Sequence, residues 1–354
     1  MRKKGTKLLS GAPLGLLPEA GRGELALIRQ IRTRSSRMRV GGKTSGVPLG
    51  IGDDCALLRL RAGEEAAVTT DLSIDGRHFR LDWHPAESVG HRSLARGLSD
   101  LAAMGARPVA AFLSLGLPRE LAKASGKAGS WIERFYDGLL ALAEEHDTPL
   151  AGGDLAESSV AVADVVLVGA VPRGRALLRS GARAGDQLYV TGTLGGAAAG
   201  LARLTEWAAA KNVRRGVPSE LEAELAAHLR PQPRMKQGLW LQRHGLASAA
   251  IDLSDGLGMD LARVCDESGV AAEVDAELLP VHAGATQAQA LHGGEDYELL
   301  FTARKSARIP DAIAGVAVTR IGHVVRRTAG RAQVTLVRGR DKQPLKARGW
   351  EHFC

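Results

Sequence analysis

The sequence is poor in aromatic residues and in cysteine. Phe, Trp and Tyr make up 4% of the 354 residues, so Ala, Leu, Val and Gly must build most of the core. The three cysteines, Cys55, Cys265 and Cys354, are odd in number and far apart, which excludes a disulfide framework and a paired-cysteine zinc site. We interpret them as buried or incidental reduced thiols.

Long hydrophobic segments are also missing. No apolar run approaches the ~18 residues that a membrane-spanning helix needs. The basic start of the chain is followed by too few apolar residues for a signal peptide. We therefore expect a cytoplasmic protein.

The familiar nucleotide-binding motifs are absent as well. The Gly-Lys-Thr at 42–44 is similar to the end of a P-loop, but Arg37 stands where its first glycine is required. At 191–196, Leu194 replaces the middle glycine of a dinucleotide fingerprint. The sequence has no His-Glu-x-x-His motif, no Gly-x-Ser-x-Gly elbow and no protein-kinase catalytic loop. These observations exclude the corresponding enzyme classes.

Positive charge is concentrated at the start of the chain. The net charge is +8, and residues 1–45 hold eleven Lys or Arg against two Glu, so the remainder is close to neutral. One interpretation is a nucleic-acid-binding segment. No aromatic residue interleaves these charges, and a solvated basic extension explains them better. We therefore do not expect nucleic acid as a partner.

The length and the alternation of patterns predict two domains. A chain of 354 residues exceeds a typical single core. Helical patterns at 86–104 and 131–146 alternate with strand patterns at 109–117 and 160–171, which indicates α/β organisation. We predict a disordered basic extension at 1–20, an N-terminal α/β domain at 21–172 and a C-terminal α/β domain at 173–354.

Carboxylates recur at the ends of apolar runs, beside Gly, Ser or Thr. The five places are 51–54, 69–71, 152–154, 252–256 and 293–296. One such Asp usually forms a turn or caps a helix, because it accepts hydrogen bonds from free backbone N–H groups. Carboxylates that converge from several strand ends, however, repel one another unless cations lie between them. Mg²⁺ binds few carboxylates and completes its shell with water and phosphate oxygens, so the pattern predicts a site for several Mg²⁺ ions and phosphate groups.

Seven blocks of the sequence together resemble the signature of the thiamine-monophosphate kinase family. They occur in the family's order, and the resemblance covers the chain from about residue 24 to the C-terminus. The Gly-Gly-Asp block alone is weak, whereas the third and the seventh blocks together are specific. The blocks are 50–56 (GIGDDCA), 70–71 (TD) with Gly76 and His78-Phe79, 98–106 (LSDLAAMGA), 152–154 (GGD), 179–182 (RSGA), 251–256 (IDLSDG) and 293–299 (GGEDYEL).

The resemblance implies a fold and a binding chemistry. The fold class is α/β, with two mixed α/β domains of the aminoimidazole ribonucleotide synthetase-like type and no P-loop. Selenophosphate synthetase shares this fold. The resemblance also implies a homodimer through the N-terminal domains, with ATP and several Mg²⁺ ions in the cleft between the domains and the dimer partner.

By position, the resemblance implies roles for individual residues. The metal ligands would be Asp54, Thr69, Thr70, Asp71, Asp100, Asp154, Asp252 and Asp255. ATP would be held by Tyr136, Gly153, Asp154, Arg179 and Ser254, and thiamine phosphate by His78, Glu295 and Trp350. No catalytic general base is expected.

Structural roles compete with several of these assignments. Asp100 could pair with Arg96 one helical turn earlier, and His78 could cap the end of a strand. Trp350 could be ordinary terminal packing, and Arg179 could be solvated in its turn.

The chain departs from the family pattern at three positions. Leu155 and Ala156 follow the Gly-Gly-Asp block where threonines are usual, and Gly97 stands where Asn is common. These changes leave the carboxylates intact but alter the local nucleotide contacts. The basic extension has no counterpart in the pattern.

The expected reaction is the in-line, ATP-dependent phosphorylation of thiamine monophosphate to thiamine diphosphate, the last step of thiamine diphosphate biosynthesis. The attacking phosphate oxygen is already an anion, and Mg²⁺ ions would bring the two polyanions together. The alternative is another ATP-using synthetase of the same superfamily with a different phosphate acceptor. The element at 76–79 and Trp350 favour the thiamine compound, and no cysteine precedes Cys55 to suggest selenophosphate synthesis.

Overall fold

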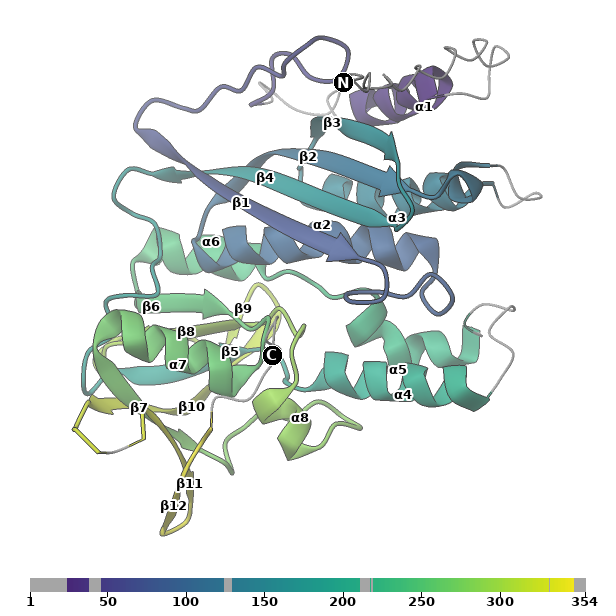
Figure 1. Ribbon diagram of the computed structural model, residues 1–354. Helices are drawn as coiled ribbons and strands as arrows, with labels where there is room; N and C mark the ends of the chain where they lie inside the picture. Colours follow the sequence, from purple (N-terminus) through teal and green to yellow (C-terminus); the bar gives the residue numbers. More distant parts are fainter. Residues whose placement is uncertain are drawn as a thin grey trace, which may run out of the picture.

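The chain forms two α/β halves, each built on one sheet (Figure 1). The computed structural model describes residues 24–37, 46–123, 129–210, 217, 219–330 and 332–346. The extension predicted at 1–20 and Trp350 lie outside these residues. None of the helices in the described ranges is both long enough and apolar enough to cross a membrane.

The N-terminal half is a four-stranded sheet with helices on one face. Its strand order is β1 (Glu64–Ile74), β4 (Val162–Pro172), β2 (Arg107–Leu117) and β3 (Leu150–Glu157), with β2 and β3 parallel and the other pairs antiparallel. Helices α2 (Ala86–Ala103) and α3 (Trp131–Glu145) cover the inner face, and α1 (Glu24–Arg37) contacts β3. A 3-10 turn, η1 (Arg119–Ala122), follows β2.

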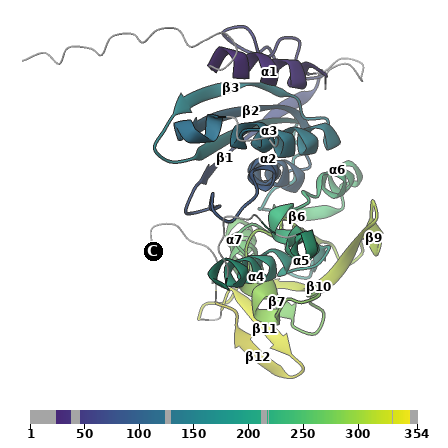
Figure 2. The ribbon, with the colours of Figure 1, turned by 90° about the vertical axis from the view of Figure 1, so that its right-hand side faces the viewer.

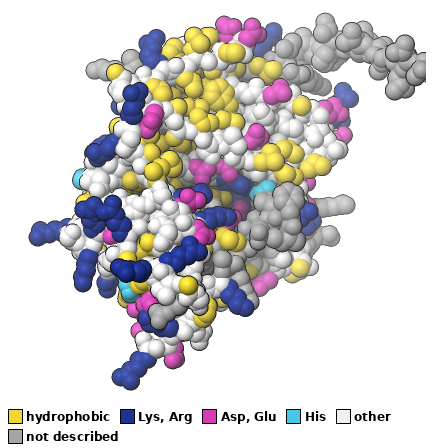
Figure 3. Space-filling model, turned by 60° about the vertical axis from the view of Figure 1, so that its left-hand side comes forward, with side chains coloured by type: hydrophobic (Ala, Val, Ile, Leu, Met, Phe, Trp, Pro, Cys, Tyr) yellow, Lys and Arg dark blue, Asp and Glu magenta, His cyan; other side chains and the backbone are white. Residues whose placement is uncertain are grey.

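The opposite face of this sheet is covered in part by the segment around Val47 and is apolar and exposed along β1. Side chains alternate between the two faces of a strand, so Val68, Thr70 and Leu72 of β1 point away from the helices while Thr69 and Asp71 point toward them. Val68 is 62% exposed and Leu72 is 45% exposed. Val68 pairs with Val168 of β4 on the same face. Figure 3 shows hydrophobic side chains gathered on this upper part of the molecule.

The C-terminal half contains an eight-stranded mixed sheet. Its order is β12 (Asp341–Pro344), β11 (Val334–Arg338), β7 (Val270–Asp275), β10 (Val316–Arg326), β5 (Gln187–Thr191), β8 (Leu299–Ala303) and β6 (Ala247–Asp252), with β9 (Ala312–Ile313) paired to β10. Its helices are α4 (Gly196–Ala210), α5 (Ser219–Leu229), α6 (Met235–His244), α7 (Leu257–Ser268) and α8 (Gln287–His292). Helices α4 and α5 form a hairpin beside the sheet (Figure 1).

Helix α2 lies between the two halves (Figure 2). Fifteen of its eighteen residues are buried, because one side packs on the N-terminal sheet and α3 and another on α6 and β6. A helix that is buried nearly all round has no face in contact with solvent. Polar residues on α2 therefore point either into packed contacts or into the space between the halves.

Small residues allow α2 to approach its neighbours closely. A Cβ atom on Gly90 would lie 1.9 Å from the Phe135 carbonyl oxygen, and one on Gly138 would lie 1.8 Å from the Glu87 carbonyl oxygen. The backbones of α2 and α3 are therefore in direct contact at a reciprocal pair of glycines. A side chain at either position requires the helices to separate.

We predict that Gly90→Ala or Gly138→Ala lowers the free energy of unfolding by about 1–3 kcal/mol, because overpacking forces a backbone shift. Urea unfolding of purified variants measures this. Gly258→Ala in α7 is the matched control, since the nearest atoms lie 3.4 Å from its added Cβ. That variant should equal the wild type or gain up to ~1 kcal/mol of helix propensity. A Gly90→Ala protein as stable as the Gly258→Ala control would contradict the close contact.

Candidate active site

A pocket of about 490 Å³ lies between the two halves. It is bounded by β1 and the following loop, by α2, by the start of α4, and by the loops that follow β6 and precede β8. Figure 3 shows acidic, basic and histidine side chains in the hollow between the halves. The lining residues include Asp71, His78, Asp100, Asp252, Ser254, Asp255 and Glu295, which are seven of the residues predicted from the sequence.

Three elements bring carboxylates together at one end of this pocket. Asp71 comes from the inner face of β1, Asp100 from α2 and Asp252 from the end of β6. The Thr69 hydroxyl donates a hydrogen bond to Asp100 Oδ2. The Ser99 hydroxyl donates to Asp252 Oδ2 at 2.8 Å. We call this part of the pocket the acidic end.

Burial and mutual repulsion raise the pKa values at the acidic end. Burial raises the pKa of Asp71 to about 6, and the charge of Asp100 adds to the effect although Arg96 opposes it. Burial, followed by the charge of Asp100, raises the pKa of Asp252 well above its usual range. The pKa of Asp100 is also raised by burial, against the hydrogen bond from Thr69. The ionised forms are therefore unfavourable here without a counter-charge.

The acidic end suits Mg²⁺ with phosphate. Asp71 Oδ2 is buried and has no hydrogen-bond partner, so it is an oxygen ligand in need of a positive partner. Among the residues that the structure describes, no three His, Cys, Asp or Glu side chains form a group that alone would hold a metal ion. Mg²⁺ usually takes only one or two carboxylates and fills its shell with water and phosphate oxygens, so the donors present fit this ion.

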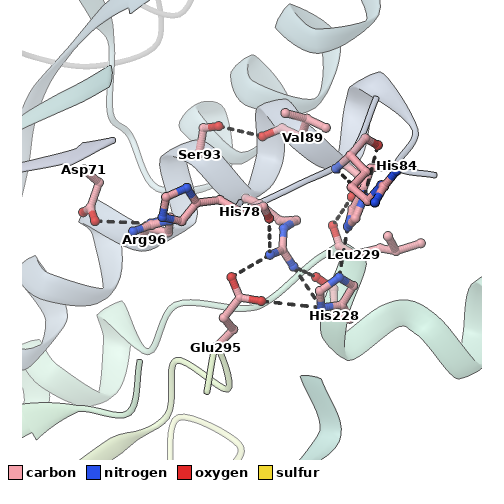
Figure 4. Close-up of polar contacts among 12 residues, drawn as sticks. Asp71, His78, His84, Val89, Ser93, Arg96, His228, Leu229 and Glu295 are labelled. Atoms are coloured by element: carbon pink, nitrogen blue, oxygen red, sulfur yellow. Dashed lines mark hydrogen bonds and ion pairs between the residues drawn. The ribbon is translucent and has the colours of Figure 1, made fainter. Parts of the chain in front are cut away.

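A second network of charged and histidine side chains forms the other end of the pocket (Figure 4). Arg92 Nη2 donates to Glu295 Oε1 at 2.7 Å and to the His78 carbonyl at 3.3 Å, and Nη1 donates to the His228 carbonyl. Burial alone would raise the pKa of Glu295, but Arg92 outweighs it and the pKa is lowered. Glu295 therefore remains an anion. We call this part of the pocket the acceptor end.

The backbone around Glu295 is strained and well anchored. Glu295 and Tyr297 have φ values of 67° and 51°, in the left-handed region that non-glycine residues rarely adopt. Their N–H groups donate to the Ser254 and Leu253 carbonyls at 2.8 and 2.9 Å. Strain of this kind persists where the surroundings over-determine it, and it clusters at binding sites. The loop after β6 and the loop before β8 therefore act as one unit.

Two buried histidines, His84 and His228, adjoin the acceptor end. His84 Nδ1 lies 3.1 Å from the Arg80 backbone nitrogen and 3.3 Å from the Arg80 carbonyl oxygen. His84 Nε2 lies 3.0 Å from His228 Nε2, so one of these two ring nitrogens donates and the other accepts. His228 Nδ1 lies 3.2 Å from Arg92 Nη1 and 3.6 Å from Glu295 Oε2. Burial, followed by the charge of Arg92, lowers the pKa of His84 to about 4 and that of His228 well below its ordinary value.

The structure divides the remaining predicted residues between several places. Asp54, Tyr136, Gly153 and Asp154 line a second pocket, of about 520 Å³, which is bounded by α1, the segment 50–56, β2, α3 and β3. Thr69 supports Asp100, whereas Thr70 is exposed on the opposite face of β1 from Asp71. Arg179 is exposed and lines neither described pocket, but its charge helps to lower the pKa of Asp100 against burial. Trp350 lies outside the described residues.

The competing structural roles are partly realised. Arg96 forms its ion pair with Asp71 at 3.2 Å and not with Asp100. His78 Nδ1 accepts from the Ile74 N–H at 3.1 Å, at the end of β1, although the ring also lines the pocket. Asp296, beside Glu295, accepts from the N–H groups of Gly195 and Ala197 at 2.6 and 3.1 Å and so caps α4. Carboxylates that are adjacent in the sequence thus have different tasks.

Sequence reasoning assigned no role at the site to Arg92, Arg96, His84 or His228. Arg92 and Arg96 stand one helical turn apart and in line with Asp100 on the helix predicted at 86–104, which was an available signal. His228 gave no signal, because it lies 136 residues from Arg92 in the chain and reaches the site only through the α4–α5 hairpin.

Comparisons with known proteins agree with this architecture. The model of the N-terminal domain of AIR synthase related proteins matches residues 52–172, and that of the C-terminal domain matches residues 183–335. These matches and the two-sheet fold define the chain as an AIR synthase related protein.

Similar proteins specify the class further. The chain is 40% identical over 348 residues to the thiamine-monophosphate kinase of Escherichia coli K12, covering 94% of this chain and 98% of the relative. The solved thiamine-monophosphate kinase of Stenotrophomonas maltophilia K279a is 40% identical with a TM-score of 0.74, covering 88% of this chain and 96% of that one. The structure of AaThiL complexed with AMPPCP and TMP is 28% identical with a TM-score of 0.70, covering 96% and 99%. The chain belongs to the thiamine-monophosphate kinase family, a family of phosphotransferases, which confirms the resemblance seen in the sequence.

The neutral histidine pair predicts a pH-dependent stability. The pKa of His84 in the folded protein, about 4, lies below the ordinary value of 6.5. The contribution of this neutral histidine to the free energy of unfolding is therefore fully present above pH 6.5 and is lost as the pH falls toward 4. The expected slope is up to ~1.4 kcal/mol per pH unit for each such histidine. His84→Gln should be less stable than the wild type at pH 7.5, and the difference should shrink at pH 5.

Urea unfolding at pH 7.5, 6.0 and 5.0 measures this difference. His323→Gln, at a histidine that is 48% exposed on β10, is the control and should follow the wild type in parallel. A constant difference between His84→Gln and the wild type at all three pH values would show that the pair is not held neutral.

Proposed function

We propose that this chain transfers the γ-phosphoryl group of ATP to the phosphate of thiamine monophosphate, giving thiamine diphosphate, in an in-line transfer assisted by several Mg²⁺ ions. The supporting observation is one pocket with an acidic end for cations and phosphates and an acceptor end built on Glu295 and His78. The 40% identical relatives named thiamine-monophosphate kinase support the same reaction, as does the binding of AMPPCP and TMP by AaThiL. A cytoplasmic location and the last step of thiamine diphosphate biosynthesis belong to this proposal.

The acidic end would hold the metal ions. Asp71, Asp100, Asp252 and Asp255 are its candidate ligands, and the unpartnered Asp71 Oδ2 is the clearest of their donor atoms. Mg²⁺ bound there would neutralise phosphate charge and hold donor and acceptor in alignment. Ser254 lies between Asp252 and Asp255 and lines the same pocket, so we assign it to ATP.

The remaining chemistry consists of positioning the acceptor. In the proposed step, a bond forms between an acceptor phosphate oxygen and the γ-phosphorus while the bond to the β–γ bridging oxygen breaks. The attacking oxygen is already ionised, so no side chain has to remove a proton. His84 and His228 fit this view, because both are held neutral and hydrogen-bonded to each other. Glu295 remains an anion beside Arg92 and is suited to the cationic vitamin ring.

We extend the proposal to a homodimer formed through the face of the N-terminal sheet that is exposed along β1. The exposed Val68 and Leu72 would be buried there. The second pocket contains Asp54, Tyr136, Gly153 and Asp154, which belong to the predicted ATP and metal site although they lie apart from the acidic end in one chain. A partner that covers this face would bring its own second pocket toward the acidic end and complete the site.

The direct test is ATP consumption by the purified protein with thiamine monophosphate, thiamine or buffer alone. We expect ADP and thiamine diphosphate in equal amounts with thiamine monophosphate only, complete loss in EDTA, and recovery on adding Mg²⁺. Turnover that persists in the chelator would exclude the multi-metal site, and equal turnover with thiamine would exclude a phosphate acceptor.

The same assay on Asp71→Asn examines the acidic end. Loss of one preorganised charge should lower kcat by about 100-fold or more, while the fold persists because the substitution removes a buried, repelled carboxylate. Asp266→Asn, at an exposed residue paired with Arg327, is the control and should keep wild-type kcat. Near-normal kinetics of Asp71→Asn would make Asp71 a structural residue.

The homodimer is tested by Val68→Asp. A charge in an apolar interface is costly, so we expect the variant to be monomeric in analytical ultracentrifugation where the wild type is dimeric. Leu278→Asp, at a leucine that is 40% exposed in the C-terminal half, should remain dimeric. An identical state for the wild type and Val68→Asp would contradict this interface.

A further inference from the structure

The two arginines of α2 are bonded in different ways. Arg92 has a side chain only 6% exposed, and both of its terminal nitrogens donate to protein groups, namely Glu295 Oε1 and the carbonyls of His78 and His228. Arg96, one turn later, has a side chain 21% exposed and donates through Nε to Asp71 Oδ1 at 3.2 Å. Both terminal nitrogens of Arg92 are therefore engaged by protein groups, whereas Arg96 uses one of its five donors.

The terminal nitrogens of Arg96 are open to the pocket. Within the described ranges neither makes a hydrogen bond, and neither is among the buried atoms that lack a partner. Arg96 also lines the pocket. A charged, planar fork of N–H donors that faces a cavity is the arrangement that proteins use to bind phosphate in a bidentate way.

The ion pair with Asp71 uses only part of the Arg96 guanidinium. An arginine that is paired with a carboxylate often contacts both of its oxygens through a fork. Here the contact is single, and Asp71 Oδ2 remains without a partner. Gly97 lies beside this oxygen, since a Cβ there would lie 3.5 Å from Asp71 Oδ2 and 2.7 Å from Leu167 Cδ1.

Arg96 also stands at the junction between the two ends of the pocket. Its charge interacts with Asp71 at the acidic end and with Tyr297 and Glu295 at the acceptor end. Figure 4 shows Arg96 beside Asp71, with Glu295 farther along toward His228. An acceptor phosphate must be attached to a ring at the acceptor end and must also reach the acidic end, so it has to lie at this junction.

We infer that Arg96 binds the phosphate group of the acceptor substrate through its two terminal nitrogens, while the hydrogen bond from Nε to Asp71 holds the guanidinium in place. The inference rests on the proposed function and adds a substrate-binding residue to it. The phosphate would be drawn into a pocket that contains five carboxylates, namely Asp71, Asp100, Asp252, Asp255 and Glu295. A fixed cation at the junction offsets their repulsion before any metal-bound nucleotide arrives.

The test compares thiamine monophosphate with thiamine, which lacks the phosphate, by isothermal titration calorimetry. In Arg96→Gln the Kd for thiamine monophosphate should rise about ten- to a hundredfold, the usual range for a lost hydrogen bond to a charged group. The Kd for thiamine should change less than about twofold, because the lost contact is to the phosphate. Arg96→Lys should recover part of the loss, since it restores a charge but not the fork.

The control is Arg107→Gln, which removes a half-buried arginine from its pair with Glu64 outside the pocket and should leave both Kd values unchanged.

Equal weakening of the binding of both ligands by Arg96→Gln would make Arg96 a residue that shapes the pocket. Unchanged binding of thiamine monophosphate would make it a counter-ion of Asp71. Either result overturns the inference. If Arg96→Gln does not fold, the Arg96→Lys comparison decides by the same criterion. A wild-type protein that fails to phosphorylate thiamine monophosphate would overturn the proposed function and this inference with it, whereas normal wild-type turnover with either result above overturns this inference alone.

Discussion

The close contact of α2 with helices of both halves determines where the polar groups of the site lie. Gly90 and Gly138 let α2 and α3 meet backbone to backbone, and a Cβ on Gly238 of α6 would lie 2.0 Å from the Ala102 carbonyl oxygen. Both contacts are too short for a side chain, so the axis of α2 has little freedom to shift. Ser99, Asp100, Arg92 and Arg96 are therefore positioned by the backbone of a rigid element, which is how precise binding sites are usually built.

The carboxylates of the site fall into two energetic classes. Those at the acidic end are buried and repel one another, and this lowers the stability of the folded protein at neutral pH. Glu295 and Glu298 are instead paired with Arg92 and Arg234. The protein thus supplies a close counter-charge to these two glutamates and leaves the acidic end with raised pKa values, a distribution typical of functional sites.

The sequence predicted local structure well because local periodicity controls it. The pattern at 86–104 became α2 (Ala86–Ala103), and the strand pattern at 109–117 became β2 (Arg107–Leu117). The strand pattern at 160–171 became β4 (Val162–Pro172) in the same way. The α/β fold class and the family were likewise confirmed.

The arrangement of the site was only partly predictable. The carboxylates at the ends of apolar runs indicated Asp71 and Asp252, whereas Asp100 was expected from the family resemblance alone. Thr70 faces away from Thr69 and Asp71, because side chains alternate along a strand. The sequence motif treats these three residues as one group and therefore does not reveal this difference. The separation of Asp54 and Asp154 from the acidic end, and the pairing of Arg92 with His228 and Glu295, depend on contacts across 136 and 203 residues, which no local pattern encodes.

The position of β1 has a consequence for the isolated protomer. β1 is the outermost strand of its sheet, eleven residues long, and one side of its backbone is unpaired within the described residues. Natural edge strands usually carry a proline, a lysine or a bulge that discourages pairing with another chain; β1 has no proline or lysine, and its register with β4 is uninterrupted. Because Val68 and Leu72 are exposed beside that free edge, a protomer without a partner is prone to aggregate through strand-to-strand pairing. Assembly through this part of the molecule would therefore act as protection against aggregation as well as completing a site.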